Sequence, residues 1–201
     1  MSTFSYLGID TSCYTTSLAL VDEEGSVIAD ERTVLPVALG EHGLRQSDGV
    51  FHHVRRLSQL FQQIDLPANI AAVGVSSQPR PNQGSYMPVF LAGLAVGAGL
   101  ANMGKIPLYK FSHQEGHIAA GLQNTIMSED FLAVHLSGGT SEVIRVTPRS
   151  AGTGFSIELL TGTTDLSAGQ MVDRVGVALG LPFPAGPYLE RLATQASGTI
   201  H

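Results

Sequence analysis

The stretch YLGIDTSCYTTSLALVD, residues 6–22, decides the fold of this chain. Its two apolar ends flank a centre of small hydroxyl residues, which is the pattern of two strands joined by a tight turn. Glu24 and Gly25 then precede a third apolar run, residues 26–29, so a second turn and a third strand are expected. The chain therefore opens on a strand, turn, strand, turn, strand unit.

Helices and further strands are expected after this opening unit. Apolar residues recur at helical spacing from 51 to 64, and residues 70–76 have the apolar run of a buried strand. A loop rich in Pro and Gly, residues 77–85, precedes the glycine-dotted segment Val89 to Leu100, which predicts a buried helix. A short strand near 107–109 and a helix from about Ser112 complete a βββαβαβα order.

The same design starts again in the second part of the chain. Residues 131–136 and 142–146 are apolar runs on either side of the turn Ser137-Gly138-Gly139-Thr140-Ser141. Residues 165–193 then predict a helix, a Pro/Gly break and a second helix. We expect an α/β architecture of two related domains, residues 1–127 and 128–201. Because a domain of about 70 residues is small, the second is expected to be incomplete and the chain to be a fragment or a truncated protein.

Composition narrows the class of protein. The chain has 201 residues, 43% of them hydrophobic, which suffices for a core. The formal net charge is -6 and the longest basic run is Arg55-Arg56, so RNA contact would need a folded patch or a partner. The single cysteine excludes an internal disulfide, and neither a signal peptide nor a run of about 20 apolar residues is present. We expect a cytoplasmic protein without membrane association.

His113 and His117 are the strongest candidates for a chemical site. At about 100° per residue, positions i and i+4 lie about 40° apart on a helix, so both rings can hold one ion. Two neutral imidazoles suit zinc or iron(II). Glu115 lies about 200° round the helix from His113, which argues against the HExxH arrangement of zinc peptidases.

Two questions about this pair stay open from its spacing. The histidines could instead be surface or helix-capping residues. A complete site also needs a third ligand. The candidates for it are Asp10, Cys13, Asp165 and Asp173.

The two hydroxyl-rich turns are candidate phosphate cradles. Backbone N–H groups and hydroxyls of residues 10–16 and 137–141 can face phosphate oxygens, although Ser-Gly-Gly-Thr is also an ordinary turn sequence. Asp10 can position a magnesium ion or a water molecule, or act only as a turn residue. Gly186 lets backbone approach a ligand such as a ribose, whereas Asp173 taken alone fits a solvated helix position beside an arginine.

Five motifs in order resemble the TsaD family, the threonylcarbamoyladenosine synthases once called O-sialoglycoprotein endopeptidases or glycoproteases. GIDTSC, residues 8–13, resembles the family's GIETSC, and the histidine pair matches its HxxxH. LSGGT at 136–140 resembles VSGGH, GQMVDR at 169–174 resembles GEAFDK, and PAGP at 184–187 resembles PGGP. Five motifs in one order are far more specific than any single one.

The resemblance implies an actin-like ATPase (ASKHA) fold with mixed sheets and flanking helices. It also implies transfer of a threonylcarbamoyl group from its adenylate to the exocyclic nitrogen of the adenosine beside the tRNA anticodon. One Fe²⁺ or Zn²⁺ ion per chain, an adenine nucleotide (threonylcarbamoyl-adenylate or ATP) and Mg²⁺ are the implied cofactors. The implied partners are tRNA, reached through partner proteins, and a TsaB-like protein of the actin fold.

Site residues follow from the motifs position by position. The resemblance makes His113 and His117 the metal ligands and leaves Asp10 as the catalytic candidate. The family's third metal ligand, an aspartate near the C-terminus, has no counterpart here. The residues implied to contact the adenylate phosphate region are His135, Leu136, Ser137, Gly138 and Gly139, and those implied to hold the nucleoside are Asp173 and Gly186.

The chain also departs from the family pattern. Acidic or histidine positions of the family are occupied here by Asp10 (for Glu), Tyr14 and Thr15 (for an acidic pair), Thr140 (for His) and Gln170 (for Glu). A long loop, residues 78–85, replaces a compact GPG turn. This depletion keeps open a non-catalytic, TsaB-like scaffold that pairs with an actin-like partner through the small-residue helix 89–100. A metallopeptidase is less favoured, because Glu115 is misplaced for it.

Overall fold

The computed structural model describes residues 4–36, 44–123, 125, 129–149 and 153–196. The chain divides into two compact units, Met1–Ile126 and Met127–His201. The domain boundary predicted between residues 127 and 128 falls outside the described residues.

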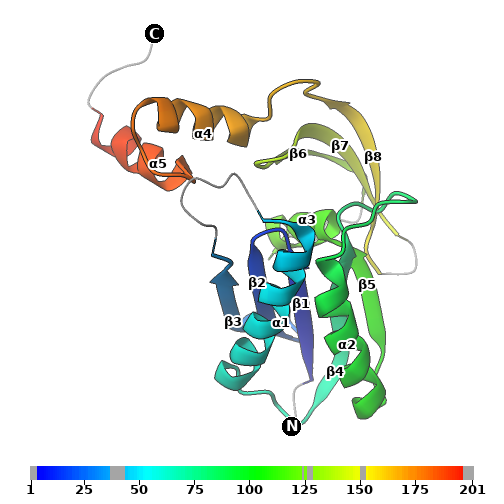
Figure 1. Cartoon of the computed structure of the whole chain (residues 1–201). Coiled ribbons are helices and arrows are strands. Elements are labelled where there is room, and N and C mark those ends of the chain that lie inside the picture. Colours follow the sequence, from blue (N-terminus) through cyan, green and yellow to red (C-terminus); the bar gives the residue numbers. More distant parts are fainter. Residues whose placement is uncertain (1–3, 37–43, 124, 126–128, 150–152, 197–201) are drawn as a thin grey trace. The chain divides into compact units, whose positions relative to one another are not determined.

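Figure 1 shows the elements of each unit along the chain. The first unit contains β1 (Ser5–Ser12), β2 (Thr15–Asp22), β3 (Val27–Val34), α1 (Gln46–Gln63), β4 (Ile70–Gln78), α2 (Phe90–Gly104), β5 (Leu108–Ser112) and α3 (His113–Gly121). The second contains β6 (Phe131–Leu136), β7 (Ser141–Pro148), β8 (Phe155–Gly162), α4 (Ala168–Ala178) and α5 (Gly186–Gln195). The predicted βββαβαβα order of the first unit is confirmed.

The first unit is built on a mixed sheet in the order β3-β2-β1-β4-β5. The opening stretch forms the antiparallel pair β1–β2, and Cys13 in its turn adopts a left-handed φ of 44°. On the side of β1 away from β2, the strands β1, β4 and β5 run parallel to one another. Helix α1 lies in the connection from β1 to β4, and α2 connects β4 to β5. The carboxyl ends of these three strands therefore meet at one edge of the sheet.

Helices α1 and α2 lie side by side on one face of this sheet (Figure 1). Alternate residues of the strands supply the core against them, because successive side chains of a strand point to opposite faces. On α1 the buried residues are Gly49, His53, Leu57 and Leu60, while Phe51 and Val54 of the predicted apolar face are more than half exposed. The core residues are Leu7, Ile9, Leu18, Leu20, Leu57, Leu60, Ile64, Val73, Val75, Ala92 and Ala101.

Two glycines of α2, Gly93 and Gly97, let the helix pack closely against its own sheet. A Cβ on Gly93 would lie 3.0 Å from Thr11 Oγ1, and one on Gly97 would lie 3.4 Å from Leu108 Cδ1. The side of α2 away from the sheet carries exposed residues such as Leu91 and Met103, so the predicted buried helix is buried on one face only in this unit. In the part of the chain that the structure describes, no helix is long and apolar enough to cross a bilayer.

The second unit contains an antiparallel sheet in the order β6-β7-β8, followed by the contacting helices α4 and α5. Strand β8 was not expected from the sequence. A Cβ on Gly176 of α4 would overlap that of Ala185, so this glycine lets the loop before α5 approach α4. Helix α4 carries exposed apolar side chains in this unit, namely Met171, Val172, Val175 and Leu179.

Candidate active site

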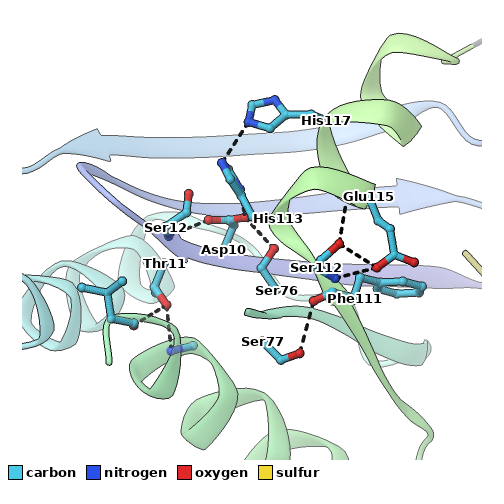
Figure 2. Close-up of polar contacts among 12 residues, drawn as sticks. Asp10, Thr11, Ser12, Ser76, Ser77, Phe111, Ser112, His113, Glu115 and His117 are labelled. Atoms are coloured by element: carbon cyan, nitrogen blue, oxygen red, sulfur yellow. Dashed lines mark hydrogen bonds and ion pairs between the residues drawn. The ribbon is translucent and has the colours of Figure 1, made fainter. Parts of the chain in front are cut away.

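Three side chains of the first unit form a hydrogen-bonded row (Figure 2). Asp10 Oδ2 lies 2.8 Å from His113 Nδ1, and His113 Nε2 lies 2.8 Å from His117 Nε2. The two rings meet edge to face, with centroids 4.3 Å apart. They project from one face of α3, as their spacing predicts.

The sheet topology places this row at the carboxyl ends of the parallel strands. The register pairs Ile9 with Val75, so Asp10 of β1 and Ser76 of β4 are neighbours on the sheet face opposite α1 and α2. Helix α3 begins at His113, directly after β5 ends at Ser112. In open α/β sheets, ligands bind at this edge of the strands.

A capping box fixes the start of α3 and with it the position of His113. Ser112 Oγ accepts a hydrogen bond from the Glu115 N–H at 3.2 Å, and Glu115 Oε2 accepts one from the Ser112 N–H at 2.8 Å. Glu115 is only 4% exposed, and its carboxylate turns back to Ser112, the N-cap residue of the helix. This geometry agrees with the expectation that Glu115 is not a base beside a metal held by the histidines.

The Asp10 carboxylate is surrounded by hydrogen-bond donors. Oδ1 accepts from the Ser12 N–H at 2.7 Å, and Oδ2 accepts from Ser76 Oγ at 2.5 Å. Burial by itself raises the pKa of Asp10. The hydrogen bond and charge of His113, together with the hydrogen bonds from Ser12 and Ser76, outweigh burial and lower the pKa from 3.8 to about 2. A carboxylate oxygen only accepts hydrogen bonds, so a hydrogen bond in this contact has His113 Nδ1 as its donor. Nε2 of the same ring faces His117.

The histidine pair fits one Zn²⁺ or Fe²⁺ ion. Two zinc–nitrogen bonds of about 2.05 Å at the tetrahedral angle place the nitrogens about 3.3 Å apart. The two Nε2 atoms are separated by 2.8 Å, so the rings would have to part by about half an ångström to hold the ion. Within the described residues, no group of three His, Cys, Asp or Glu side chains is arranged to hold an ion. The pair could therefore supply two ligands, and a metal site would need further ones.

The candidates for a third ligand lie in different surroundings. Asp10 contacts the far nitrogen of His113 rather than the nitrogen that faces His117. Partial burial, and then the charge of Asp10, raise the pKa of the Cys13 thiol, which disfavours the thiolate that binds metals. Asp165 and Asp173 belong to the second unit.

The turn between β6 and β7 is internally bonded. Ser137 Oγ accepts from the Gly139 N–H at 3.2 Å and from the Thr140 N–H at 3.0 Å. These two amides were expected to face a phosphate, and a bound anion would have to replace the serine oxygen. A Cβ on Gly169 would lie 2.7 Å from Ser137 O, so the start of α4 packs directly against this turn.

The other predicted nucleotide-binding residues lie on β6, α4 and α5. His135 Nδ1 lies 3.9 Å from Glu142 Oε2 of the neighbouring strand, and Leu136 is exposed. Asp173 Oδ1 accepts a hydrogen bond from the Ala185 N–H at 2.7 Å. This bond places Asp173 next to Ala185, the residue before Gly186. The partner of Asp173 is thus a backbone N–H group rather than the arginine considered from the sequence.

Three polar residues around the first site escaped sequence reasoning. Ser12 and Ser76 bind Asp10, and a signal for Ser76 existed, because it follows the apolar run of a parallel strand. His53 is fully buried, with its Nδ1 2.8 Å from Thr16 Oγ1 of β2. Burial lowers the pKa of His53 below 6.5, although the Cys13 backbone and the charge of Asp10 raise it in part.

The fold of the chain is shared with solved structures. The ethanolamine utilization protein EutJ from Carboxydothermus hydrogenoformans matches with a TM-score of 0.52 at 14% identity, over 93% of this chain and 61% of that chain. A ROK family protein from Streptococcus pneumoniae matches with a TM-score of 0.52 at 14% identity, over 98% of this chain and 68% of that one. These likenesses confirm the predicted actin-like ATPase fold.

A third structure, YeaZ from Pseudomonas aeruginosa, has a TM-score of 0.44 at 14% identity, over 79% of this chain and 66% of that chain. The chain thus spans 61% to 68% of the length of these three structures. The family model described as TsaD, tRNA N6-adenosine threonylcarbamoyltransferase, matches residues 51–201, which is more than half of the chain. This chain belongs to the TsaD family.

Proposed function

We propose that this protein takes part in threonylcarbamoyl transfer to tRNA, with one Zn²⁺ or Fe²⁺ ion held by His113 and His117. The transfer joins the exocyclic nitrogen of the adenosine beside the anticodon to the carbamoyl carbon. It breaks the bond from that carbon to the phosphate oxygen of the adenylate, and it releases AMP and a proton. Membership of the TsaD family supports this class of reaction.

The observation that carries the proposal is the convergence of the two Nε2 atoms at 2.8 Å. A histidine pair with only a capping role would not need both rings to face one point, because Ser112 and Glu115 already cap α3. A bound ion would supply a Lewis acid that polarises the carbamoyl carbonyl of the donor. His113 and His117 would hold that ion beside the carboxyl ends of β1, β4 and β5.

The second unit would bind the adenylate. The turn His135 to Gly139 is the proposed contact for the phosphate region, and Asp173 and Gly186 are the proposed contacts for the nucleoside. The bond from Ala185 to Asp173 supports the joint placement of the last two residues. Gly186 also has open space, because a Cβ there would meet Val172 Cγ1 only at 3.9 Å. Packing within this unit therefore does not account for the glycine at this position.

Metal content and transfer activity test the proposal together. The purified chain and the variants His113→Ala, His117→Ala and His52→Ala are loaded with Zn²⁺ or Fe²⁺, desalted and measured by mass spectrometry. His52 is a matched control, since it is a histidine of α1 outside the candidate site. Each protein is then incubated with labelled threonylcarbamoyl-adenylate and unmodified tRNA, with and without a TsaB-like partner.

We expect about one ion per chain in the parent and His52→Ala proteins, loss of the ion in the other two variants, and labelled tRNA only with the loaded proteins. An unchanged metal content in His113→Ala would overturn the metal site. Metal binding without labelled tRNA, together with a stable complex with the partner, would instead favour the scaffold role. The scaffold role is favoured by one observation, namely that residues such as Tyr14 and Gln170 stand where the family has acidic residues.

A further inference from the structure

We propose that Asp10 is a positioning residue that fixes the tautomer and orientation of His113, and that Ser76 and Ser12 hold Asp10 for this task. The inference assigns Asp10 neither to the metal nor to proton transfer with substrate. It rests on the proposed function only in taking His113 and His117 as metal ligands.

The hydrogen-bond directions around Asp10 support this role. Its two oxygens accept from the Ser12 N–H at 2.7 Å and the Ser76 hydroxyl at 2.5 Å, and Oδ2 also lies 2.8 Å from His113 Nδ1 (Figure 2). Both carboxylate oxygens are thereby committed to protein donors. The carboxylate is held in one orientation by groups from β1, β4 and α3, so it can in turn hold the imidazole.

The consequence for His113 concerns which nitrogen has a free lone pair. A neutral imidazole has one N–H group, and a proton fixed on Nδ1 leaves Nε2 as the ligand. Metal-binding histidines usually donate their other N–H to a carboxylate or a carbonyl, which sets ring orientation and makes the ligand more basic. Asp10 occupies this position on His113, and the Nε2 atom opposite it faces His117.

Ser76 supports Asp10 through the strand register. Ser76 is on β4, which runs parallel to β1, and it lies beside Asp10 of β1. Its side chain is largely buried. The next residue, Ser77, points to the other face of the strand and donates to Phe111 O at 3.2 Å. Each of these two adjacent serines donates a hydrogen bond from its hydroxyl group, but only the hydroxyl of Ser76 bonds to Asp10.

An asparagine cannot reproduce this arrangement at position 10. Its amide has one oxygen acceptor and one NH₂ donor, whereas the carboxylate accepts from donors on both of its oxygens. In either orientation the NH₂ group would face a donor, either the Ser12 N–H or the pair formed by Ser76 and His113. Asp10→Asn keeps the size of the side chain, so it tests the acceptor pattern rather than packing.

Zinc affinity of the full chain is the first measurement, made by competition with a chromophoric chelator. We expect Asp10→Ala and Asp10→Asn to weaken zinc binding about 10- to 100-fold, the usual cost of losing the partner of a metal-bound histidine. Ser76→Ala should weaken it about fivefold, which corresponds to about one hydrogen bond. Ser77→Ala and Asp30→Ala, the latter removing an exposed carboxylate of β3, should bind like the parent.

The tautomer of His113 is the second measurement and needs no metal. Nitrogen-15 NMR of the zinc-free chain should show His113 protonated on Nδ1, and this state should no longer be fixed in Asp10→Ala. Circular dichroism checks that each variant folds. If a variant fails to fold, the Ser76→Ala and Ser77→Ala pair still decides, because both remove one serine hydroxyl from β4.

The possible results separate this inference from the proposed function. Parent-like zinc affinity in a folded Asp10→Asn protein, or equal losses in Ser76→Ala and Ser77→Ala, would overturn the positioning role alone, provided that His113→Ala abolishes zinc binding. If His113→Ala binds zinc like the parent, the metal site itself fails and both proposals fall. An Nε2-protonated His113 in the zinc-free parent chain would also overturn the positioning role.

Discussion

His113 Nδ1 lies 2.8 Å from Asp10 Oδ2, although the two residues are 103 positions apart in the sequence. Asp10 belongs to the hairpin that opens the fold, and His113 is the first residue of α3. This contact makes the opening hairpin a part of the candidate metal site.

Zinc should stabilise the chain through the histidine pair. A ligand that binds only the folded state at about 100 times its Kd adds about 2.7 kcal/mol to the free energy of unfolding. We expect this increase in urea titrations with zinc, its loss on addition of a chelator, and none in His117→Ala. The control variant His52→Ala should retain it. A similar zinc effect in His117→Ala would show that the ion binds elsewhere.

The capping box of α3 should contribute measurably to stability. Ser112→Ala removes both the acceptor for the Glu115 N–H and a partner of the Glu115 carboxylate, which is 4% exposed. We expect a loss of about 0.5–2 kcal/mol in the free energy of unfolding. The exposed Ser47 on α1, changed to Ala, serves as the control and should cost far less. Equal losses in the two variants would contradict the role assigned to Ser112.

Stability should fall on mild acidification because of His53. Burial lowers its pKa in the folded state below the ordinary 6.5, so the unfolded chain binds the proton more tightly. The contribution is complete above pH 6.5 and is lost as the pH falls below that value towards the folded-state pKa. The groups that act on it are Asp10 and the Cys13 backbone, which raise the pKa, and His52, which lowers it.

Urea titrations between pH 5 and pH 8 measure this effect. We expect the slope of the unfolding free energy with pH to be smaller in His53→Leu than in the parent chain. His52→Gln should reduce the slope less, because His52 is the smallest of the influences on the pKa of His53. A His53→Leu protein with the slope of the parent would assign the acid sensitivity to other groups.

Two glycines of the second unit should respond differently to alanine. A Cβ on Gly169 would lie 2.7 Å from the Ser137 carbonyl oxygen and from Gly138 Cα, so Gly169→Ala forces α4 away from the turn. We expect a loss of about 1–3 kcal/mol, typical of overpacking. Gly186→Ala should cost no stability, because the nearest atom to its Cβ would be 3.9 Å away. Thermal unfolding compares the two variants, and the opposite ranking would refute the packing argument.

Local patterns predicted most of the elements. Apolar runs indicated the strands on both sides of each turn, and Ser112 was correctly placed at the start of a helix. Strand β8 was missed, because its alternation breaks at Leu159-Leu160. The register there shifts, with Val143 opposite Thr161 and Ile144 opposite Leu159, so Leu160 is the extra residue of a bulge. The alternating Phe155, Ile157 and Leu159 were an available signal.

Helix α1 buries a side that its apolar pattern did not fully predict. Its apolar periodicity placed Phe51 and Val54 with the core residues, but both are more than half exposed. The buried side instead runs through Gly49 and His53, since Gly49 sits against Val89 and His53 bonds to Thr16. Hydrophobicity alone does not reveal that a histidine with a partner on a neighbouring strand can be buried.

The sequence by itself determined that His113 and His117 share one helix face, because i and i+4 spacing is a local property of the backbone. The order of the five motifs along the chain indicated the TsaD family, and the family match confirms it. Only the tertiary structure decided that Asp10 and Ser76 belong beside His113. The parallel pairing of β1, β4 and β5 brings together strand ends that are distant along the chain, and no local pattern encodes which of their side chains then meet.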